Sequence, residues 1–284
     1  MSEAATGLPS SAAMTPVPYR VRSRVAENRD SATLCLEPVR QSLPAPKPGE
    51  FMMMYAFGIG EIAISVSGLP SESDAAIRHT IRSVGAVSRA LHDAQPGTVI
   101  GMRGPFGTHW GLDRAVGHDL VIVAGGVGLA PLRPVVLEAL NNRDRFGRVT
   151  VIAGARSRDD FLFDVDLRDW ARDGSIDLHL TVDVPVQGWP GEVGFVTESL
   201  RRLSVRPERT TAFLCGPEPM MRNAAKELLR KRLAANRIRA PLERTTPSGV
   251  GRSRHRHPGP PLPRRDGPVT GFDIAEPLLR TEEL

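Results

Sequence analysis

The sequence has few cysteines, few aromatic residues and no long apolar run, and each scarcity excludes a class of protein. Two cysteines, Cys35 and Cys215, are too few for a disulfide framework, which predicts a reducing, cytoplasmic setting. No apolar stretch approaches the roughly 20 residues that a membrane-spanning helix requires, so no membrane span is expected. Residues 1–14 lack the apolar core of a signal peptide and are expected to form a disordered tail.

The scarcity of aromatic residues also bears on the basic character of the chain. The formal net charge of +5 is modest, and much of the basic excess lies in residues 252–265, which are rich in arginine and proline. This segment contains no aromatic side chain on which a base could stack. Nucleic acid is therefore not an expected partner, and a solvated irregular loop is the favoured interpretation.

The most informative feature that is present is the glycine-rich segment 124–131. It follows the apolar run 120–123, which predicts a buried parallel strand, and it precedes residues 132–140, which predict a helix. Glycine lets a backbone approach a ligand closely, and the start of a helix offers unpaired N–H groups to a phosphate. The segment therefore predicts a dinucleotide pyrophosphate site in preference to a simple tight turn.

Residues 15–113 are predicted to form a small antiparallel β barrel. Short runs of branched and apolar residues, separated by turn signals, favour strands in this region. Strands are expected at 19–25, 33–39, 51–56, 61–67 and 79–84, and a helix at 86–93. The run 61–67 alternates, with Ile62, Ile64 and Val66 on one face.

Residues 114–236 change to alternating strands and helices, which predicts a parallel sheet with helices on both faces. Strands are expected at 120–123, 149–153, 176–181 and 211–214, and helices at 132–140, 164–173, 197–203 and 219–232. Residues 237–284 are rich in proline and arginine and have weak periodicity. The expected fold class is thus a β barrel, then a parallel α/β domain, then a small C-terminal region.

Two segments of the predicted barrel are candidates for contact with a ligand. The strand 61–67 could present a backbone edge, an apolar face and the Ser65 hydroxyl to a flat ring. The segment 82–88 combines Arg82 with the N–H groups at a helix start, which makes it a second potential phosphate site. An ordinary helix start explains this second segment equally well.

The predicted α/β domain adds candidates at the ends of its strands, where open parallel sheets bind ligands. Arg156 follows one strand, although a surface arginine is the alternative. Cys215 ends another strand and leads through Gly216 and Pro217 to Met220. Cys215 could lie beside a reacting ring or be a buried small hydrophobic residue. No base neighbours it in sequence, so it is not predicted to be a nucleophile.

Taken together and in this order, the motifs resemble the ferredoxin–NADP reductase superfamily. The match is closer to one branch, the gamma (diaphorase) subunits of soluble nickel–iron hydrogenases and sulfhydrogenases, with dihydroorotate dehydrogenase electron-transfer subunits as near relatives. The motifs that carry the resemblance are Pro-Gly-Glu-Phe at 48–51, Gly-Ile-Gly-Glu at 58–61, Arg-Ser-Val-Gly-Ala-Val-Ser at 82–88, Arg-Gly-Pro-Phe-Gly at 103–107, Gly-Leu-Ala-Pro-Leu-Arg-Pro at 128–134, Gly-Ala-Arg at 154–156 and Cys-Gly-Pro at 215–217.

The resemblance implies an NAD(P)H-dependent FAD oxidoreductase that serves as the electron-transfer subunit of a hydrogenase-like complex. In that family the barrel holds FAD, the second domain holds NADH or NADPH, and hydride passes between nicotinamide C4 and flavin N5. The implied catalytic residues are Ser65, near flavin N5, and Cys215. The implied cofactor-binding residues are Ile62, Ala63, Ile64, Ser65, Arg82, Gly85, Ala86, Val87 and Ser88 for FAD, and Gly125, Gly126, Gly128, Leu129, Ala130, Pro131, Arg156, Cys215, Gly216, Pro217 and Met220 for the nucleotide.

The sequence departs from the family at the flavin strand. The wider superfamily has an arginine and an aromatic residue at the positions that Ile62 and Ile64 occupy here. The hydrogenase branch is similarly aliphatic, so this departure agrees with the closer resemblance.

A larger departure lies in residues 237–284. The family holds a [2Fe-2S] cluster with cysteines spaced Cys-x4-Cys-x2-Cys-x7-Cys, and the aligned positions here are Ser248, Ser253, Arg256 and Arg264. Serine is a poor substitute for a soft thiolate, and arginine stays protonated and cannot ligate iron. We therefore expect no metal and no [2Fe-2S] cluster in this chain.

The missing cysteines also support a second interpretation, a structural or regulatory subunit that keeps the fold but transfers no electrons. In either case the expected partners are hydrogenase-like or other redox subunits. The choice between NADH and NADPH stays open. Arg156 could meet a 2′-phosphate, whereas Asp183 could prefer a free ribose hydroxyl.

Overall fold

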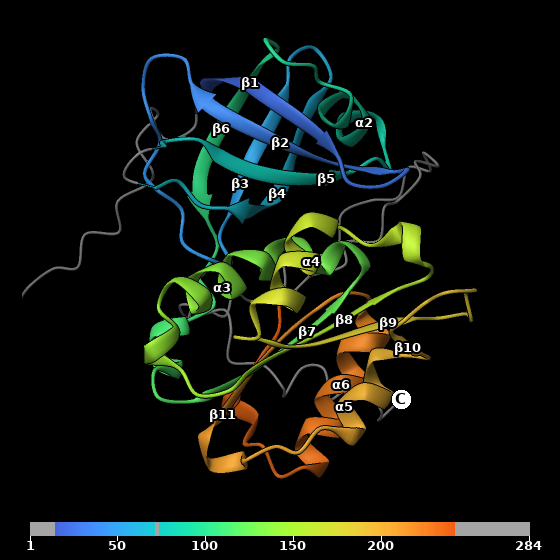
Figure 1. Cartoon of the computed structure of the whole chain (residues 1–284). Helices are drawn as coiled ribbons and strands as arrows, with labels where there is room; N and C mark the ends of the chain where they lie inside the picture. The colour runs from blue at the N-terminus through green and yellow to red at the C-terminus, as the bar shows by residue number, and fades with distance from the viewer. Residues whose placement is uncertain (1–14, 72–73, 242–284) are drawn as a thin grey trace, which may run out of the picture.

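The computed structural model describes residues 15–71 and 74–241 of the chain. Figure 1 shows two parts, a barrel formed by the first half and a layered α/β domain formed by the second. The expected tail, residues 1–14, lies outside the described residues. So do the four aligned cluster positions, Ser248, Ser253, Arg256 and Arg264. No helix in the described part is long and apolar enough to cross a membrane.

The first domain is a closed antiparallel barrel with strand order β1-β2-β5-β4-β3-β6. Its elements are β1 Val17–Ala26, β2 Ser31–Pro38, β3 Phe51–Ala56, β4 Gly60–Gly68, β5 Ile77–Arg82, α2 Ala86–His92 and β6 Val99–Phe106. Inward-facing apolar side chains such as Leu34, Met52, Met54 and Ile81 fill its core. The barrel predicted from strand spacing is thus confirmed.

The strand that closes the barrel, β6, was not expected from the sequence. It pairs with β1 on one side and with β3 on the other. Its sequence contains Gly101, Gly104 and Pro105, which are unfavourable in an ordinary strand. Gly101 has a packing reason, because a Cβ there would overlap the side chain of Pro16. Strand propensity disfavours glycine at this position, and the close approach of Pro16 explains why a glycine is found there.

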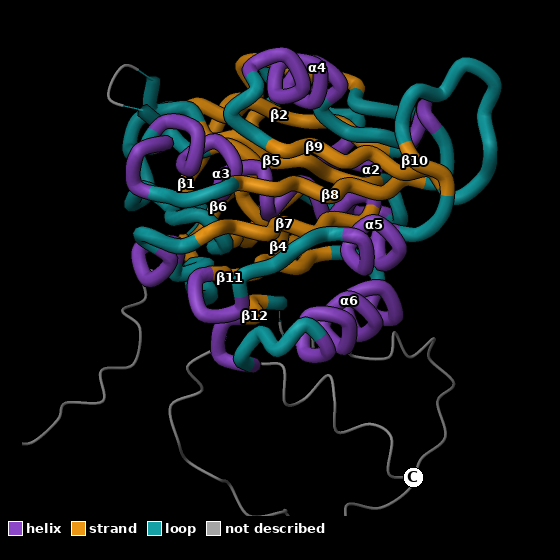
Figure 2. Tube along the Cα trace, turned by 60° about the horizontal axis from the view of Figure 1, so that its bottom comes forward, coloured by secondary structure: helices purple, strands orange, loops and turns teal. Residues whose placement is uncertain are grey.

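The second domain is a six-stranded sheet with the order β10-β9-β8-β7-β11-β12, visible in Figure 2. Every neighbouring pair is parallel. Its strands are β7 Asp119–Gly125, β8 Val149–Ala155, β9 Asp177–Val182, β10 Glu192–Val193, β11 Thr210–Cys215 and β12 Ile238–Arg239. Its helices are α3 Leu129–Asn141, α4 Asp164–Asp173, α5 Val196–Arg202 and α6 Glu218–Arg230.

Helices cover both faces of this sheet, as the alternating pattern predicted. In Figure 1, α3 and α4 lie between the sheet and the barrel, whereas α5 and α6 cover the opposite face. Two separate apolar cores match these layers. One contains Leu132, Val136 and Trp170 from the barrel side, and the other contains Leu200 and Leu228 from the far side.

Most boundaries differ by a few residues from the expected ones, and two of the differences concern the candidate site and the edge of the sheet. Helix α3 begins at Leu129 rather than at residue 132, with Pro131 inside its first turn. Proline is tolerated there because the first N–H groups of a helix have no partner within the helix. The sheet also extends past residue 236, since β12 pairs with β11. Within the described residues, short 3-10 helices lie at Leu112–Ala115, Gly126–Gly128, Arg143–Arg145, Arg158–Asp160, Pro207–Arg209 and Ala235–Arg237.

Candidate cofactor and nucleotide sites

The carboxyl ends of three parallel strands lie level with one another beside the glycine-rich loop. Ala124, near the end of β7, pairs with Ala153 of β8 and with Cys215 of β11. One residue further on, Gly125 pairs with Gly154. This edge is where open parallel sheets bind nucleotides. The fold therefore brings the glycine-rich loop and the Cys-Gly-Pro motif together, although they are far apart in sequence.

The glycines of the loop have different structural roles. A Cβ on Gly128 would overlap the backbone of Cys215 and Gly216, and a Cβ on Gly125 would overlap the Met220 side chain. Gly128 therefore allows the start of α3 to pack against the turn after β11, and Gly125 allows the end of β7 to pack against Met220 of α6. Gly126 is exposed, has a φ of +53° and has open space where its Cβ would lie. Of these three glycines, Gly126 is the one whose backbone faces a space that a ligand could fill.

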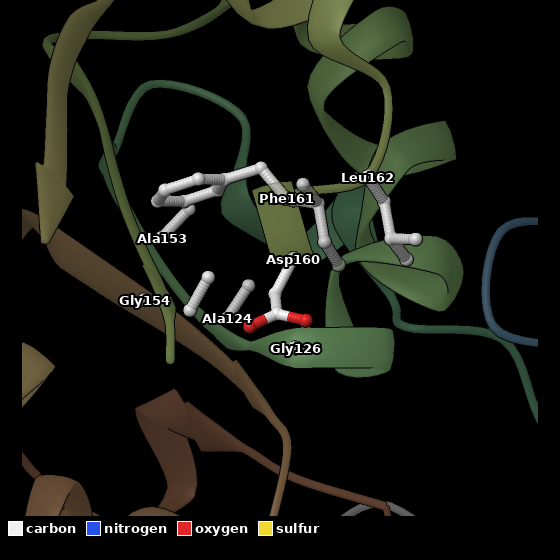
Figure 3. Close-up of a pocket in the computed structure, with 9 residues that line it drawn as sticks. Ala124, Gly126, Ala153, Gly154, Asp160, Phe161 and Leu162 are labelled. Atoms are coloured by element: carbon white, nitrogen blue, oxygen red, sulfur yellow. The ribbon is translucent and has the colours of Figure 1, made fainter. Parts of the chain in front are cut away.

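A small pocket, too narrow to hold a water molecule, lies beside Gly126 at the ends of β7 and β8 (Figure 3). Asp160, Phe161 and Leu162, from the loop after β8, complete its lining. The sequence patterns did not single out these three residues, because they belong to no motif. Their loop lies beside the strand ends only in the folded structure. The pocket is lined by Ala124, Gly126, Leu129, Ala153, Gly154, Ala155, Asp160, Phe161 and Leu162.

Asp160 places a carboxylate at this pocket, as Figure 3 shows. Its Oδ2 accepts a hydrogen bond of 2.8 Å from the Ser157 hydroxyl, and its Oδ1 lies 3.7 Å from Nε of Arg29. Its backbone carbonyl accepts a hydrogen bond of 3.0 Å from Asn28 of the barrel. The loop that lines the pocket is therefore anchored to the first domain. Its carboxylate is a suitable acceptor for ribose hydroxyl groups.

The other candidates of the second domain surround this edge. Arg156 is exposed just beyond β8, and Pro217 is exposed beyond β11. Cys215 is buried, with 8% of its surface exposed. Met220 packs against Gly125 and Gly216. Leu129 and Ala130 are buried in the core, Pro131 is partly buried, and Asp183 is exposed after β9.

On the barrel, the predicted flavin strand is β4. Ile62 and Ile64 are partly buried and pack against the barrel core, whereas Ala63 is exposed and Ser65 is partly buried. Glu61, at the start of this run, is held by Arg103, whose Nη2 lies 2.6 Å from Oε1. The first part of the strand therefore follows the expected alternation of side chains, whereas Val66 and Ser67 are both buried.

His79, which the sequence patterns did not single out, lies directly behind the flavin strand. It sits on β5 opposite Val66, and its Nδ1 lies 3.0 Å from the carbonyl oxygen of Ser65. The side chain is fully buried, and this desolvation lowers the pKa of His79 to about 4 despite hydrogen bonds to the backbone of Ser65 and Ile64. His79 is therefore neutral at pH 7, and in the tautomer that carries its hydrogen on Nδ1 it donates a hydrogen bond to the Ser65 carbonyl.

The potential phosphate segment 82–88 is arranged around the start of α2. The buried hydroxyl of Ser88 accepts hydrogen bonds from the backbone N–H groups of Val84 and Gly85 and donates to the Gly85 carbonyl. Nε of Arg82 lies 2.8 Å from Asp30. Ser88 thus caps the helix from inside. Gly85 and Ala86 are exposed at the start of the helix, so a ligand can reach this part of the segment.

An apolar surface adjoins this segment. Val84, Phe57 and Ile59 expose 75%, 58% and 53% of their surface, which is unusual for such side chains. The turn between β3 and β4 lies against α2, because a Cβ on Gly60 would contact Val87. Exposed apolar side chains beside exposed helix N–H groups suit a ligand with a flat ring and an anionic group, so these residues fit FAD.

The barrel and the parallel sheet, with a glycine-rich strand–helix loop at its carboxyl edge, define the ferredoxin–NADP reductase-like class of two-domain NAD-binding oxidoreductases. The family described as "Oxidoreductase NAD-binding domain" matches residues 122–226. The fold is shared with an Amycolatopsis cytochrome P450 reductase, with a TM-score of 0.68, 23% identity and coverage of 79% of this chain and 68% of that one.

Sequence relatives narrow the class. Sulfhydrogenase 1 subunit gamma of Pyrococcus furiosus is 32% identical over 80% of this chain and 80% of its own length. A "probable dihydroorotate dehydrogenase B (NAD(+)), electron transfer subunit" of Methanocella arvoryzae is 33% identical over 83% of this chain and 82% of its own. The chain belongs to the family of these flavin-dependent electron-transfer subunits, which confirms the resemblance and the oxidoreductase class expected from its motifs.

Proposed function

We propose that the chain binds FAD on the barrel and NADH or NADPH at the carboxyl edge of the sheet, and exchanges hydride between them. The observation that carries this proposal is the convergence of β7, β8 and β11 on one edge, with the open backbone of Gly126 beside a pocket that contains Asp160. When bound, FAD supplies the acceptor for a hydride from the nicotinamide. The protein supplies position and electrostatics.

Particular residues would carry out this positioning. The N–H groups of Gly85 and Ala86 would bind the FAD pyrophosphate, and Ile64 and Ser65 would lie against the flavin ring. Ser65 would lie near flavin N5, with its backbone held from behind by His79. On the other domain, Gly126 would lie at the nucleotide pyrophosphate and Cys215 would line the nicotinamide site. This assignment keeps only some of the residues that the sequence motifs indicated, because Ser88, Gly125 and Gly128 have capping or packing roles.

We further propose that the chain works in a reducing cytoplasm as one subunit of a complex with a hydrogenase-like or other redox partner. The sulfhydrogenase and dihydroorotate dehydrogenase relatives are each described as subunits, which supports a partner. The residues Ser248, Ser253, Arg256 and Arg264 offer no thiolate, so we propose that this chain itself lacks the [2Fe-2S] relay. The same substitutions favour a second candidate function, a subunit that retains the fold without transferring electrons.

The visible spectrum of protein purified anaerobically, before and after addition of NADH or NADPH, tests the proposal. A flavin spectrum that bleaches with the nucleotide, without iron–sulfur absorbance, is the expected result. Additional iron–sulfur absorbance would contradict the proposed loss of the cluster. Absence of flavin even after reconstitution with FAD would favour the non-catalytic subunit.

A further inference from the structure

One arginine of the nucleotide domain reaches the flavin strand of the barrel. Arg133, on α3, donates a hydrogen bond of 2.8 Å from Nη1 to the carbonyl oxygen of Ser67 on β4. Its Nε pairs with Asp166 on α4, and its guanidinium lies 4.9 Å from the ring centroid of Phe163. The Arg133 side chain is only 15% exposed. One nearly buried guanidinium therefore joins α3, α4 and the flavin strand.

A second connection joins the same two regions by another route. The backbone N–H of Phe163, just before α4, donates a hydrogen bond of 2.8 Å to Oε2 of Glu27, directly after β1. The Thr33 hydroxyl donates to Oε1 of the same carboxylate at 2.6 Å. The hydroxyls of Thr33 and Thr80 lie 2.8 Å apart, and those of Thr80 and Ser67 also lie 2.8 Å apart. This chain of hydrogen bonds ends on Ser67, the residue whose carbonyl binds Arg133.

The two connections are placed where they would govern the distance between the cofactors of the proposed function. Ser67 lies two residues beyond Ser65 on β4. Arg133 lies on the helix that begins directly after the loop containing Gly126. Thr33, Thr80 and Ser67 are buried, so their hydrogen bonds are shielded from competition by water. Contacts to the charged groups of Arg133 and Glu27 are stronger than those between neutral groups.

We propose that Arg133 and Glu27 are positioning residues that hold the nucleotide domain on the flavin strand at the separation needed for hydride transfer. This inference rests on the proposed function. Neither residue is required to touch FAD or the nucleotide. Because misplacement of reacting groups by about 1 Å can cost roughly 100-fold in rate, loosening of this contact affects the reaction more than it affects binding.

The test uses the full chain reconstituted with FAD and the variants Arg133→Met, Arg133→Lys, Glu27→Ala and Glu27→Gln. Arg206→Met is the matched control, because Arg206 pairs with Asp119 at the opposite, amino-terminal end of β7. Stopped-flow flavin reduction across NADH and NADPH concentrations separates the limiting rate from the nucleotide Kd. The long-wavelength charge-transfer absorbance reports nicotinamide–flavin stacking, and hydrogen exchange reports protection around Phe163 and in β4.

We expect Arg133→Met and Glu27→Ala to lower the limiting rate by roughly 10- to 100-fold and to weaken the charge-transfer band. Their nucleotide Kd should change by less than about threefold, because neither side chain is assigned to nucleotide binding. Hydrogen exchange around Phe163 and in β4 should accelerate. Arg133→Lys and Glu27→Gln should recover part of the rate, and Arg206→Met should match the unaltered protein.

Unchanged limiting rates and unchanged exchange in both Arg133→Met and Glu27→Ala would overturn the inference. Faster exchange with an unchanged rate would also overturn it, since the contacts would then be structural only. If NADH and NADPH fail to reduce the flavin of the unaltered protein, the proposed function fails. Hydrogen exchange would still decide whether Arg133 and Glu27 hold the two domains together.

Discussion

Gly128 and Cys215, 87 positions apart in the sequence, are in such close contact that a Cβ on Gly128 would overlap the Cys215 backbone. The contact joins the start of α3 to the end of β11. It gives the third glycine of the motif a packing role, while Gly126 remains open on the ligand side. The close approach of these two elements brings the glycine-rich loop and the Cys-Gly-Pro turn to one edge of the sheet.

The replacement Gly128→Ala should lower the free energy of unfolding by roughly 3 kcal/mol, the upper part of the range for overpacking, because the opposing atoms are backbone. Urea denaturation of the apoprotein measures this change. Gly174→Ala is the control. Gly174 has a φ of +70° but open space around its missing Cβ. That variant should lose only about 1 kcal/mol, through backbone strain alone. Equal losses in the two variants would mean that Gly128 is not tightly packed.

The stability of the protein should depend on pH through His79. Burial lowers its folded-state pKa to about 4, below the value near 6.5 of an unfolded chain, so the folded state binds fewer protons in this interval. The contribution is complete above about pH 6.5 and decreases as the pH falls toward 4, by roughly 3 kcal/mol at most. His79→Leu should flatten that part of the curve in urea titrations. An unchanged slope in the variant would assign the pH dependence to other groups.

A carboxylate at the start of α2 should affect folding and FAD binding in opposite directions. Ala86 is exposed in the first turn, which contains no acidic residue. Ala86→Asp should stabilise the apoprotein by about 0.3–1 kcal/mol through the helix dipole. It should also weaken FAD binding about tenfold or more, because the carboxylate repels a pyrophosphate at the same N–H groups. Thermal unfolding and FAD titration measure the two effects.

Ala86→Asn is the matched control for that experiment, because it has nearly the same shape without the charge. FAD affinity should be close to normal in this variant. If Ala86→Asp retained full FAD affinity, the pyrophosphate would have to bind elsewhere on the barrel.

Iron content should respond to the four aligned C-terminal positions. The unaltered chain should contain no iron after anaerobic reconstitution with iron and sulfide, because it offers no thiolates there. The combined replacement Ser248→Cys, Ser253→Cys, Arg256→Cys and Arg264→Cys should introduce iron–sulfur absorbance. A variant that lacks the Arg256→Cys change should take up less. Iron in the unaltered chain would contradict the proposed loss of the cluster.

Local sequence patterns were sufficient for much of the fold. Alternation in 61–67 predicted β4, and the apolar run 120–123 before a glycine-rich loop predicted β7 and the helix that follows. These signals are local, because a strand or helix with one buried face repeats its apolar residues at a fixed period. Strand β6 was missed because Gly101 and Pro105 obscure its period, and its role depends on two distant partners, β1 and β3.

The candidate site likewise has one part that the sequence predicted and another part that only the structure showed. The motifs around Gly126 and Cys215 were visible in the sequence, since glycine and small residues mark close backbone approach. Asp160, His79 and Glu27 were not singled out, and Arg133 appeared only as part of the motif 128–134, without a role of its own. Each acquires its proposed or observed role only through contact with a residue from another element, such as Ser65 for His79 and Ser67 for Arg133.

The sequence by itself therefore determined the two-domain class, the family and the chemistry of the loops, because these depend on residue type and on spacing along the chain. Tertiary structure decided which glycine faces the ligand side and which one packs. It also decided that Ser88 caps a helix and that Arg133 and Glu27 connect the two domains. These assignments depend on distances between segments that lie far apart in sequence, and only chain folding sets those distances.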